Sequence, residues 1–173
     1  MSKYISQIKN QNDNLYDCIL SLSRNKILYT KFNLSDTFQN RIHLIFIHIS
    51  FIFLKVKSDK KKKYKRFYQS MFNLIFEKIE INMRESGLGD STINKNMRFL
   101  VKVFYKILLE CEHYREMSLE SKNVFLYKNL TLNSLKNDDK NNEIVEYFSK
   151  YEAFCFDLSS DSVLQGELKF NYN

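Results

Sequence analysis

The chain has 173 residues, of which 44% are hydrophobic, and it contains 15 Phe, 11 Tyr and no proline. This length and composition fit one globular domain with a buried core and exclude a disordered tail. The formal net charge of +7 would favour an anionic partner such as RNA or a membrane, but a lysine-rich composition also arises from an A/T-biased genome, so charge alone assigns no partner.

The pattern of apolar residues is helical along most of the chain. Without proline and with only three glycines, the sequence lacks the turn signals of sandwiches and barrels. We therefore expect an all-α fold, with a single compact bundle of about six to seven helices over residues 1–173. A short C-terminal extended strip is expected to close the bundle, and residues 1–12 are expected to form a loose N-terminal arm.

The first third of the chain predicts a helix around Leu15 to Leu22, a short helical piece from Ile27 to Phe32 and then a long core helix. Ser35-Asp36-Thr37 supplies side chains that can cap this core helix, which is expected from about 36 to 57. Its apolar run, residues 42–54, would span only about 20 Å as a helix, short of the roughly 30 Å hydrocarbon core of a membrane. A buried core helix is therefore favoured over a transmembrane span.

Two amphipathic helices are predicted in the middle of the chain. The lysine run 60–63 is expected to be a solvated turn and helix start, followed by an apolar stripe from Tyr64 to Met83. Gly87 can adopt the left-handed conformation that ends a helix. Asp90-Ser91-Thr92 is expected to cap the next helix, whose apolar stripe runs from Ile93 to Cys111.

Shorter elements are predicted in the last third of the chain. A helix through Val124 and Leu130 is followed by a polar loop over 136–142 and a helix over 143–157. The tail from Ser159 to Asn173 is expected to form a short turn and an extended strip that packs back on the bundle.

The sequence offers no catalytic or metal-binding motif. Its three glycines cannot form a nucleotide-binding loop. His43 and His48 are five residues apart, about 140° around a helix, so they cannot hold one metal from one face and are predicted to be hydrogen-bonded core or groove residues. Cys18, Cys111 and Cys155 lack any paired spacing and are interpreted as small apolar residues in a reducing cytosol. We expect no enzymatic activity, no cofactor and no metal.

One segment concentrates charge and glycine at an expected turn: FEKIEINMRESGLGD, residues 76–90. Its acidic helix end, followed by Asn-x-Arg-Glu-x-Gly-x-Gly-Asp, resembles the ubiquinol-cytochrome c chaperone family of alphaproteobacteria and mitochondria. Lys78 and Lys106 depart from the family's usual acidic and small residues. Further landmarks stand in the family's order between Leu15 and Phe170: Tyr16, Arg24, Tyr29, Asp36-Thr37, Arg41, His48, Lys95, Met97, Phe104-Tyr105, Tyr114, Gly166 and Phe170.

The resemblance implies a cytoplasmic assembly factor that binds newly made cytochrome b and supports assembly of the ubiquinol-cytochrome c reductase of the respiratory chain. Further candidate partners are the ribosome, a small partner protein and the inner face of the membrane, with no specific nucleic acid sequence. The alternative is a basic helical adaptor that binds a ribosome or membrane surface without contacting the client. An exposed apolar groove would favour the chaperone, and a continuous Lys/Arg face without a groove would favour the adaptor.

Six residues that match the family pattern are predicted to contact the client or a partner: Arg84, Glu85, Asp90, His48, Arg41 and Asp36. Charge and glycine are concentrated around the first three. The structural alternative is that Arg84 and Asp90 only pair and cap at the ends of two helices.

Overall fold

The computed structural model describes residues 2–57, 62–132, 138–166 and 168–172. These residues form α-helices and contain no strand, apart from one isolated bridge between Leu34 and Leu132. The all-α prediction is confirmed. The elements are α1 (Ser2–Ser23), α2 (Lys26–Thr30), α3 (Phe38–Lys57), α4 (Lys62–Glu85), α5 (Asp90–Glu112), the 3-10 helix η1 (Tyr114–Glu116), α6 (Leu119–Asn129), α7 (Asp138–Asp157) and α8 (Ser160–Leu164).

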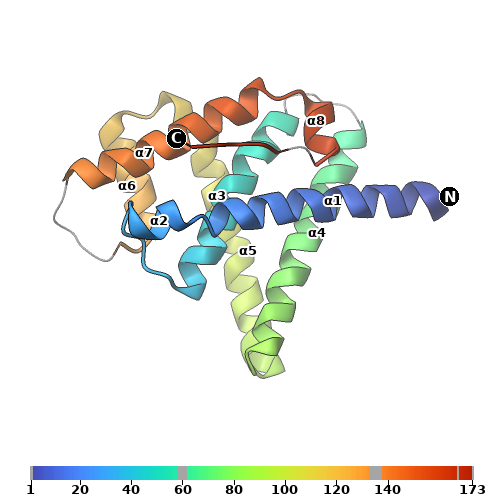
Figure 1. Cartoon of the computed structure of the whole chain (residues 1–173). Helices are drawn as coiled ribbons and strands as arrows, with labels where there is room; N and C mark the ends of the chain where they lie inside the picture. The colour runs from blue at the N-terminus through green and yellow to red at the C-terminus, as the bar shows by residue number, and fades with distance from the viewer. Residues whose placement is uncertain (1, 58–61, 133–137, 167, 173) are drawn as a thin grey trace.

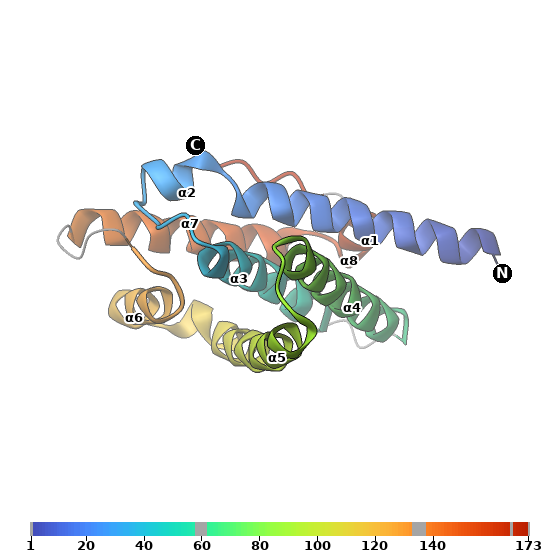
Figure 2. The ribbon, with the colours of Figure 1, turned by 90° about the horizontal axis from the view of Figure 1, so that it is seen from below.

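Helix α3 is the centre of the bundle, with α1, α4, α5 and α7 packed around it (Figures 1 and 2). Every residue from Ile42 to Phe53 is buried. A helix that is covered on all sides needs apolar residues on all sides, which explains its continuous apolar run. The Thr37 hydroxyl accepts a hydrogen bond from the Asn40 amide at 3.1 Å, which is the predicted cap. No described helix is both long and apolar enough to span a bilayer.

Helices α4 and α5 form a hairpin whose connecting turn projects away from the rest of the bundle (Figure 1). Their inner faces bury the two predicted stripes in one core, including Met71 and Ile75 from α4 and Leu100 and Phe104 from α5. Gly87 ends α4 with φ of +79°, as the sequence predicts.

The start of α5 differs from the prediction. Its N-cap residue is Gly89, whose lack of a side chain leaves the cap without a side-chain hydrogen bond, and Asp90 is the first helical residue. A carboxylate in the first turn is still favourable, because it lies at the positive end of the helix dipole.

Gly87 and Gly89 provide a direct test of this turn. We expect Gly87→Val to lower the free energy of unfolding by about 1–2 kcal/mol and by more than Gly89→Ala, because β-branched residues rarely adopt positive φ. A Cβ would meet nothing within 4 Å at either glycine, so steric room does not separate the two sites. Urea melts measure both, and Gly87→Ala is the size-matched comparison. Equal or reversed midpoint shifts would place the helix end elsewhere.

Two polar segments are helical where the sequence predicted otherwise. Helix α1 begins at Ser2 rather than after a loose arm over 1–12, and α7 begins at Asp138, inside the predicted loop 136–142. Asn12 illustrates the reason, because it is buried and its amide donates a hydrogen bond to the Ser70 hydroxyl on α4 at 2.8 Å. Of the lysine run predicted as a turn, residues 60 and 61 lie outside the described residues, and α4 begins at Lys62.

The C-terminal residues 168–172 form the predicted strip, which follows α8 and packs on α7 (Figure 1), and its Tyr172 ring contacts Phe32 just after α2. The Phe170 ring contacts the rings of Tyr147, Tyr151 and Phe154. Before the strip, Gly166 has φ of +75°, and a Cβ there would lie 2.9 Å from the Gln11 carbonyl oxygen of α1. Glycine is therefore required for both the bend and the close approach to α1.

Candidate functional site

Three of the predicted contact residues lie at the tip of the α4–α5 hairpin. The Arg84 guanidinium donates to Glu80 Oε1 at 2.8 Å and to Asp90 Oδ1 at 2.6 Å, which links the end of α4 to the start of α5. Glu85 is exposed beside this pair. Leu88 in the turn is 39% exposed. The tip thus combines a braced ion pair with charge and apolar surface that remain open to a partner.

His48 lies in the core, which confirms its interpretation as a hydrogen-bonded core residue and does not fit a contact with a client. Its side chain is 0% exposed, with Nδ1 2.7 Å from the Leu44 carbonyl oxygen and Nε2 2.9 Å from the Tyr147 hydroxyl. Burial lowers the pKa of His48 to about 4, so the ring is neutral at pH 7. The neutral ring donates from Nδ1 and accepts at Nε2. In this structure His48 joins α3 to α7 and has no surface on which to meet a client.

Asp36 and Arg41 form a separate pair at the start of α3. Arg41 donates from Nε and Nη2 to the two carboxylate oxygens of Asp36 at 2.6 and 2.8 Å. This side-chain hydrogen bonding lowers the pKa of Asp36. Both residues are exposed, but they pair with each other and not with the residues of the hairpin tip. The six predicted residues therefore occupy three separate places.

A row of cations on α5 was missed in the sequence. Lys95, Arg98, Lys102 and Lys106 are exposed and follow one another at helical spacing, so they share the outer face of α5. Phe99 lies among them and is 59% exposed. We call these five residues the cationic face. The sequence feature that could have predicted the cationic face is the absence of any acidic residue between Asp90 and Glu110.

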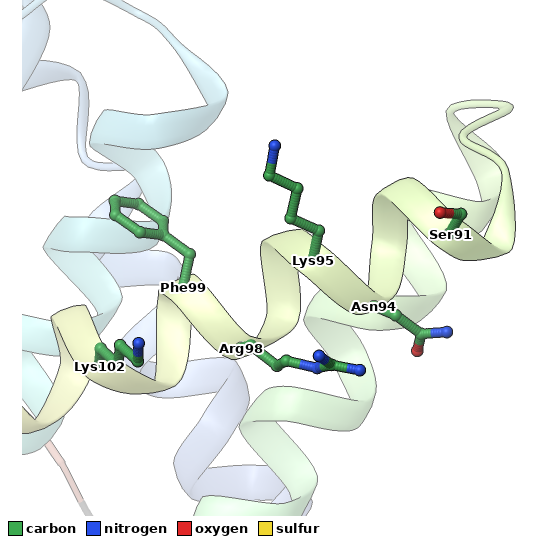
Figure 3. A pocket seen from close by; sticks show the side chains of 6 residues that line it. All are labelled: Ser91, Asn94, Lys95, Arg98, Phe99 and Lys102. Atoms are coloured by element: carbon green, nitrogen blue, oxygen red, sulfur yellow. The ribbon is translucent and has the colours of Figure 1, made fainter.

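The cationic face carries an open surface hollow of about 740 Å³, lined by Ser91, Asn94, Lys95, Arg98, Phe99 and Lys102. Figure 3 shows Lys95 and Phe99 projecting from one side of α5, with Asn94 and Arg98 projecting from the other. Because every lining residue belongs to α5, this is an open helix face and not an enclosed cavity.

A second hollow, of about 330 Å³, lies where α5, η1 and α6 meet. Its base is Phe125, which is 4% exposed, and Val124 on α6 is 61% exposed. Lys128 pairs with Glu110 at 2.7 Å and holds α6 to the end of α5. We call this site the α6 hollow; it is lined by Glu110, Met117, Glu120, Ser121, Val124, Phe125 and Lys128. The sequence predicts a helix through Val124, and the structure leaves the side chain of this residue exposed on that helix.

Comparison with known proteins identifies the family of this chain. The family model described as ubiquinol-cytochrome C chaperone matches residues 30–170. The chain belongs to the ubiquinol-cytochrome c chaperone family. The crystal structure of the Cbp3 homolog from Brucella abortus is similar with a TM-score of 0.84 and 17% identity, over 99% of this chain and 94% of that chain. At this identity the likeness shows the fold. No curated protein matches the chain.

The match to the chaperone family extends from α2 to the C-terminal strip, so it includes the hairpin tip, the cationic face and the α6 hollow. Within the described ranges of this family member, no group of three or more His, Cys, Asp or Glu side chains is placed to hold a metal. Cys111 and Cys155 are buried, and burial raises the pKa of Cys155 to about 12. Both thiols therefore remain protonated and pack as small apolar groups.

Proposed function

We propose that this protein is a non-enzymatic assembly chaperone that holds newly made cytochrome b and supports assembly of ubiquinol-cytochrome c reductase. The observation that carries the proposal is the α6 hollow, where Met117, Val124 and Phe125 form an apolar patch among charged and polar residues on a member of the ubiquinol-cytochrome c chaperone family. A client made of transmembrane helices exposes apolar side chains until its partners arrive, and such side chains need an apolar surface to cover them.

The α6 hollow has the character of a client-binding surface. Val124, which lines the hollow, is 61% exposed above the buried ring of Phe125. Met117 on the wall has a flexible thioether side chain that adapts to different apolar partners. At about 330 Å³ the hollow suits individual side chains of a client segment and not a whole helix.

The hairpin tip is the second contact that we propose, for the client or for a small partner protein. The ion pairs of Arg84 with Glu80 and Asp90 brace the turn, so that it offers a fixed shape. Glu85 and Leu88 then provide charge and apolar surface at a projecting point of the molecule. On the basis of the family resemblance, we also propose that the protein works in the cytoplasm, beside the ribosome and the inner face of the membrane.

The experiment is carried out in a strain whose cytochrome b depends on this protein. We expect Val124→Ser to reduce co-purification of newly made cytochrome b by about tenfold, because truncating a central contact costs on the order of 1.4 kcal/mol or more. Phe38→Ser is the matched control, since Phe38 is 49% exposed but lies on α3 and does not line the hollow. Thermal unfolding establishes that all variants fold. Undiminished recovery of cytochrome b with the α6 variant would contradict the proposed site.

The same strain tests the hairpin tip through Arg84→Ala combined with Asp90→Ala. The expected result is a folded protein with less assembled cytochrome b and other membrane complexes intact. A normal level of assembled cytochrome b in this variant would mean that the turn only connects α4 and α5 and does not contact the client or a partner.

A basic adaptor without client contact is the second candidate function, and the cationic face of α5 favours it. The two functions differ in what the α6 hollow does. If the protein were only an adaptor, the α6 variant would retain normal assembly of cytochrome b, whereas neutralising the cations of α5 would abolish it.

A further inference from the structure

We propose that the cationic face of α5 docks the protein on the surface of a membrane that contains anionic phospholipids. This docking rests on the proposed function, in which the protein works beside the inner face of the membrane, and it names the surface and the lipid class that make the contact. It would hold the α6 hollow close to the bilayer in which a membrane-protein client resides.

The charge of this face is not neutralised within the protein. Lys95, Arg98, Lys102 and Lys106 follow at intervals of three or four residues, so they form a line of about 16 Å along α5. Among the described residues, none of these four side chains forms an ion pair. By contrast, Lys128 and Arg84 are each held by a carboxylate. The line is therefore available to an anionic partner.

Apolar side chains accompany the cations. Phe99 is 59% exposed between Lys95 and Lys102, and Leu109, two turns beyond Lys102 on the same side of α5, is 60% exposed. A helix that lies in a membrane interface combines these two features, with aromatic and aliphatic groups entering the headgroup region and lysines reaching the phosphates. Cations alone would bind many polyanions. The exposed Phe99 and Leu109 favour a partner that is both anionic and apolar, which is a property of a membrane surface.

The position of α5 in the bundle fits a flat partner. Seen along the hairpin, α5 lies at the outer edge of the molecule, opposite α2, with α3 packed on its inner side (Figure 2). An open face formed by a single helix can lie on a plane, whereas a single nucleic acid strand is usually held in a positively charged groove. Three of the four cations are lysines, which lack the planar fork that arginine uses for paired contacts to nucleic acid phosphates. A lipid surface is therefore favoured over RNA.

Insertion of Phe99 can be measured directly because the protein has no tryptophan. In Phe99→Trp the single indole reports on its surroundings by fluorescence. With vesicles of phosphatidylcholine and phosphatidylglycerol, we expect a blue shift and quenching by brominated lipid. Phe38→Trp is the control, since Phe38 is 49% exposed on α3 and should give neither change. Equal changes at both positions, or none at position 99, would overturn the proposal.

The contribution of charge is measured by vesicle co-sedimentation. We expect Lys95→Gln, Arg98→Gln and Lys102→Gln together to weaken binding to the anionic vesicles by on the order of 100-fold, at about fivefold for each cation. The matched control is Arg24→Gln, Lys26→Gln and Lys169→Gln, which removes the same charge from exposed residues outside α5 and should retain binding. Circular dichroism checks that both variants remain helical.

Two further outcomes would overturn the proposal that this face docks on a membrane. The first is equal binding of the natural protein to anionic vesicles and to vesicles of phosphatidylcholine alone. The second is a response of Phe99→Trp to RNA with none to vesicles, which would assign the face to nucleic acid. None of these measurements contains cytochrome b, so the docking surface and the chaperone function can fail independently.

Discussion

Leu100→Asp is expected to unfold the protein. Leu100 lies on the inner face of α5, is 6% exposed and belongs to the main apolar core. An unpaired carboxylate in such a place costs several kcal/mol even if it becomes protonated, and a domain of this size is stable by only about 5–15 kcal/mol.

The neighbouring residue provides the control for this prediction. Phe99 is 59% exposed, so Phe99→Asp introduces the same carboxylate into the same helix at a position open to water. Circular dichroism and urea melts should show loss of helix, or a midpoint far below that of the natural protein, for Leu100→Asp only. Similar midpoints for the two variants would mean that α5 does not pack as described.

The helices that build the core could be predicted because their apolar residues recur at intervals of three and four, which places them on one face of an α-helix. The stripes from Tyr64 to Met83 and from Ile93 to Cys111 predicted α4 and α5, and the apolar run 42–54 predicted a helix covered on all sides. The end of α4 at Gly87 was also predictable, since glycine adopts positive φ without the steric cost that a side chain adds.

The polar ends of helices were less predictable. Residues 138–142 are all polar and include two Asn, which favour turns, yet they extend α7 because the apolar half of that helix is anchored in the core. The same holds for α1, where Asn12 is buried against α4 by a contact distant in sequence. Local composition carries no information about such contacts.

The candidate site depended on which apolar and charged faces remain uncovered, and a sequence pattern does not specify this. Val124 is an apolar residue of α6, but none of the helices in the described part of the chain covers it, so it belongs to a surface hollow. His48 stands in a helix that is apolar on every side, and only the packing of α7 reveals that it pairs with Tyr147. The α5 cations were attributed to overall composition, although their spacing places them on one face.

The burial of His48 makes stability depend on pH. Its pKa is lowered from 6.5 to about 4 because burial disfavours the charged ring. Above pH 6.5 the ring is neutral in both the folded and the unfolded chain, and its contribution to stability is complete. As the pH falls towards 4, the unfolded chain binds a proton that the folded chain does not, so the free energy of unfolding decreases. Burial also lowers the pKa of His43, which acts in the same direction.

We expect the free energy of unfolding to fall by about 2 kcal/mol between pH 7.5 and pH 5 through His48, and urea melts at several pH values measure this. The comparison is His48→Gln, which cannot titrate. This variant should be less stable than the natural protein at pH 7.5, because glutamine does not reproduce the contacts of the ring with Leu44 and Tyr147. Its stability should nevertheless decline less steeply over the same interval. Parallel declines in the two proteins would show that His48 gains a proton in the folded state as readily as in the unfolded chain.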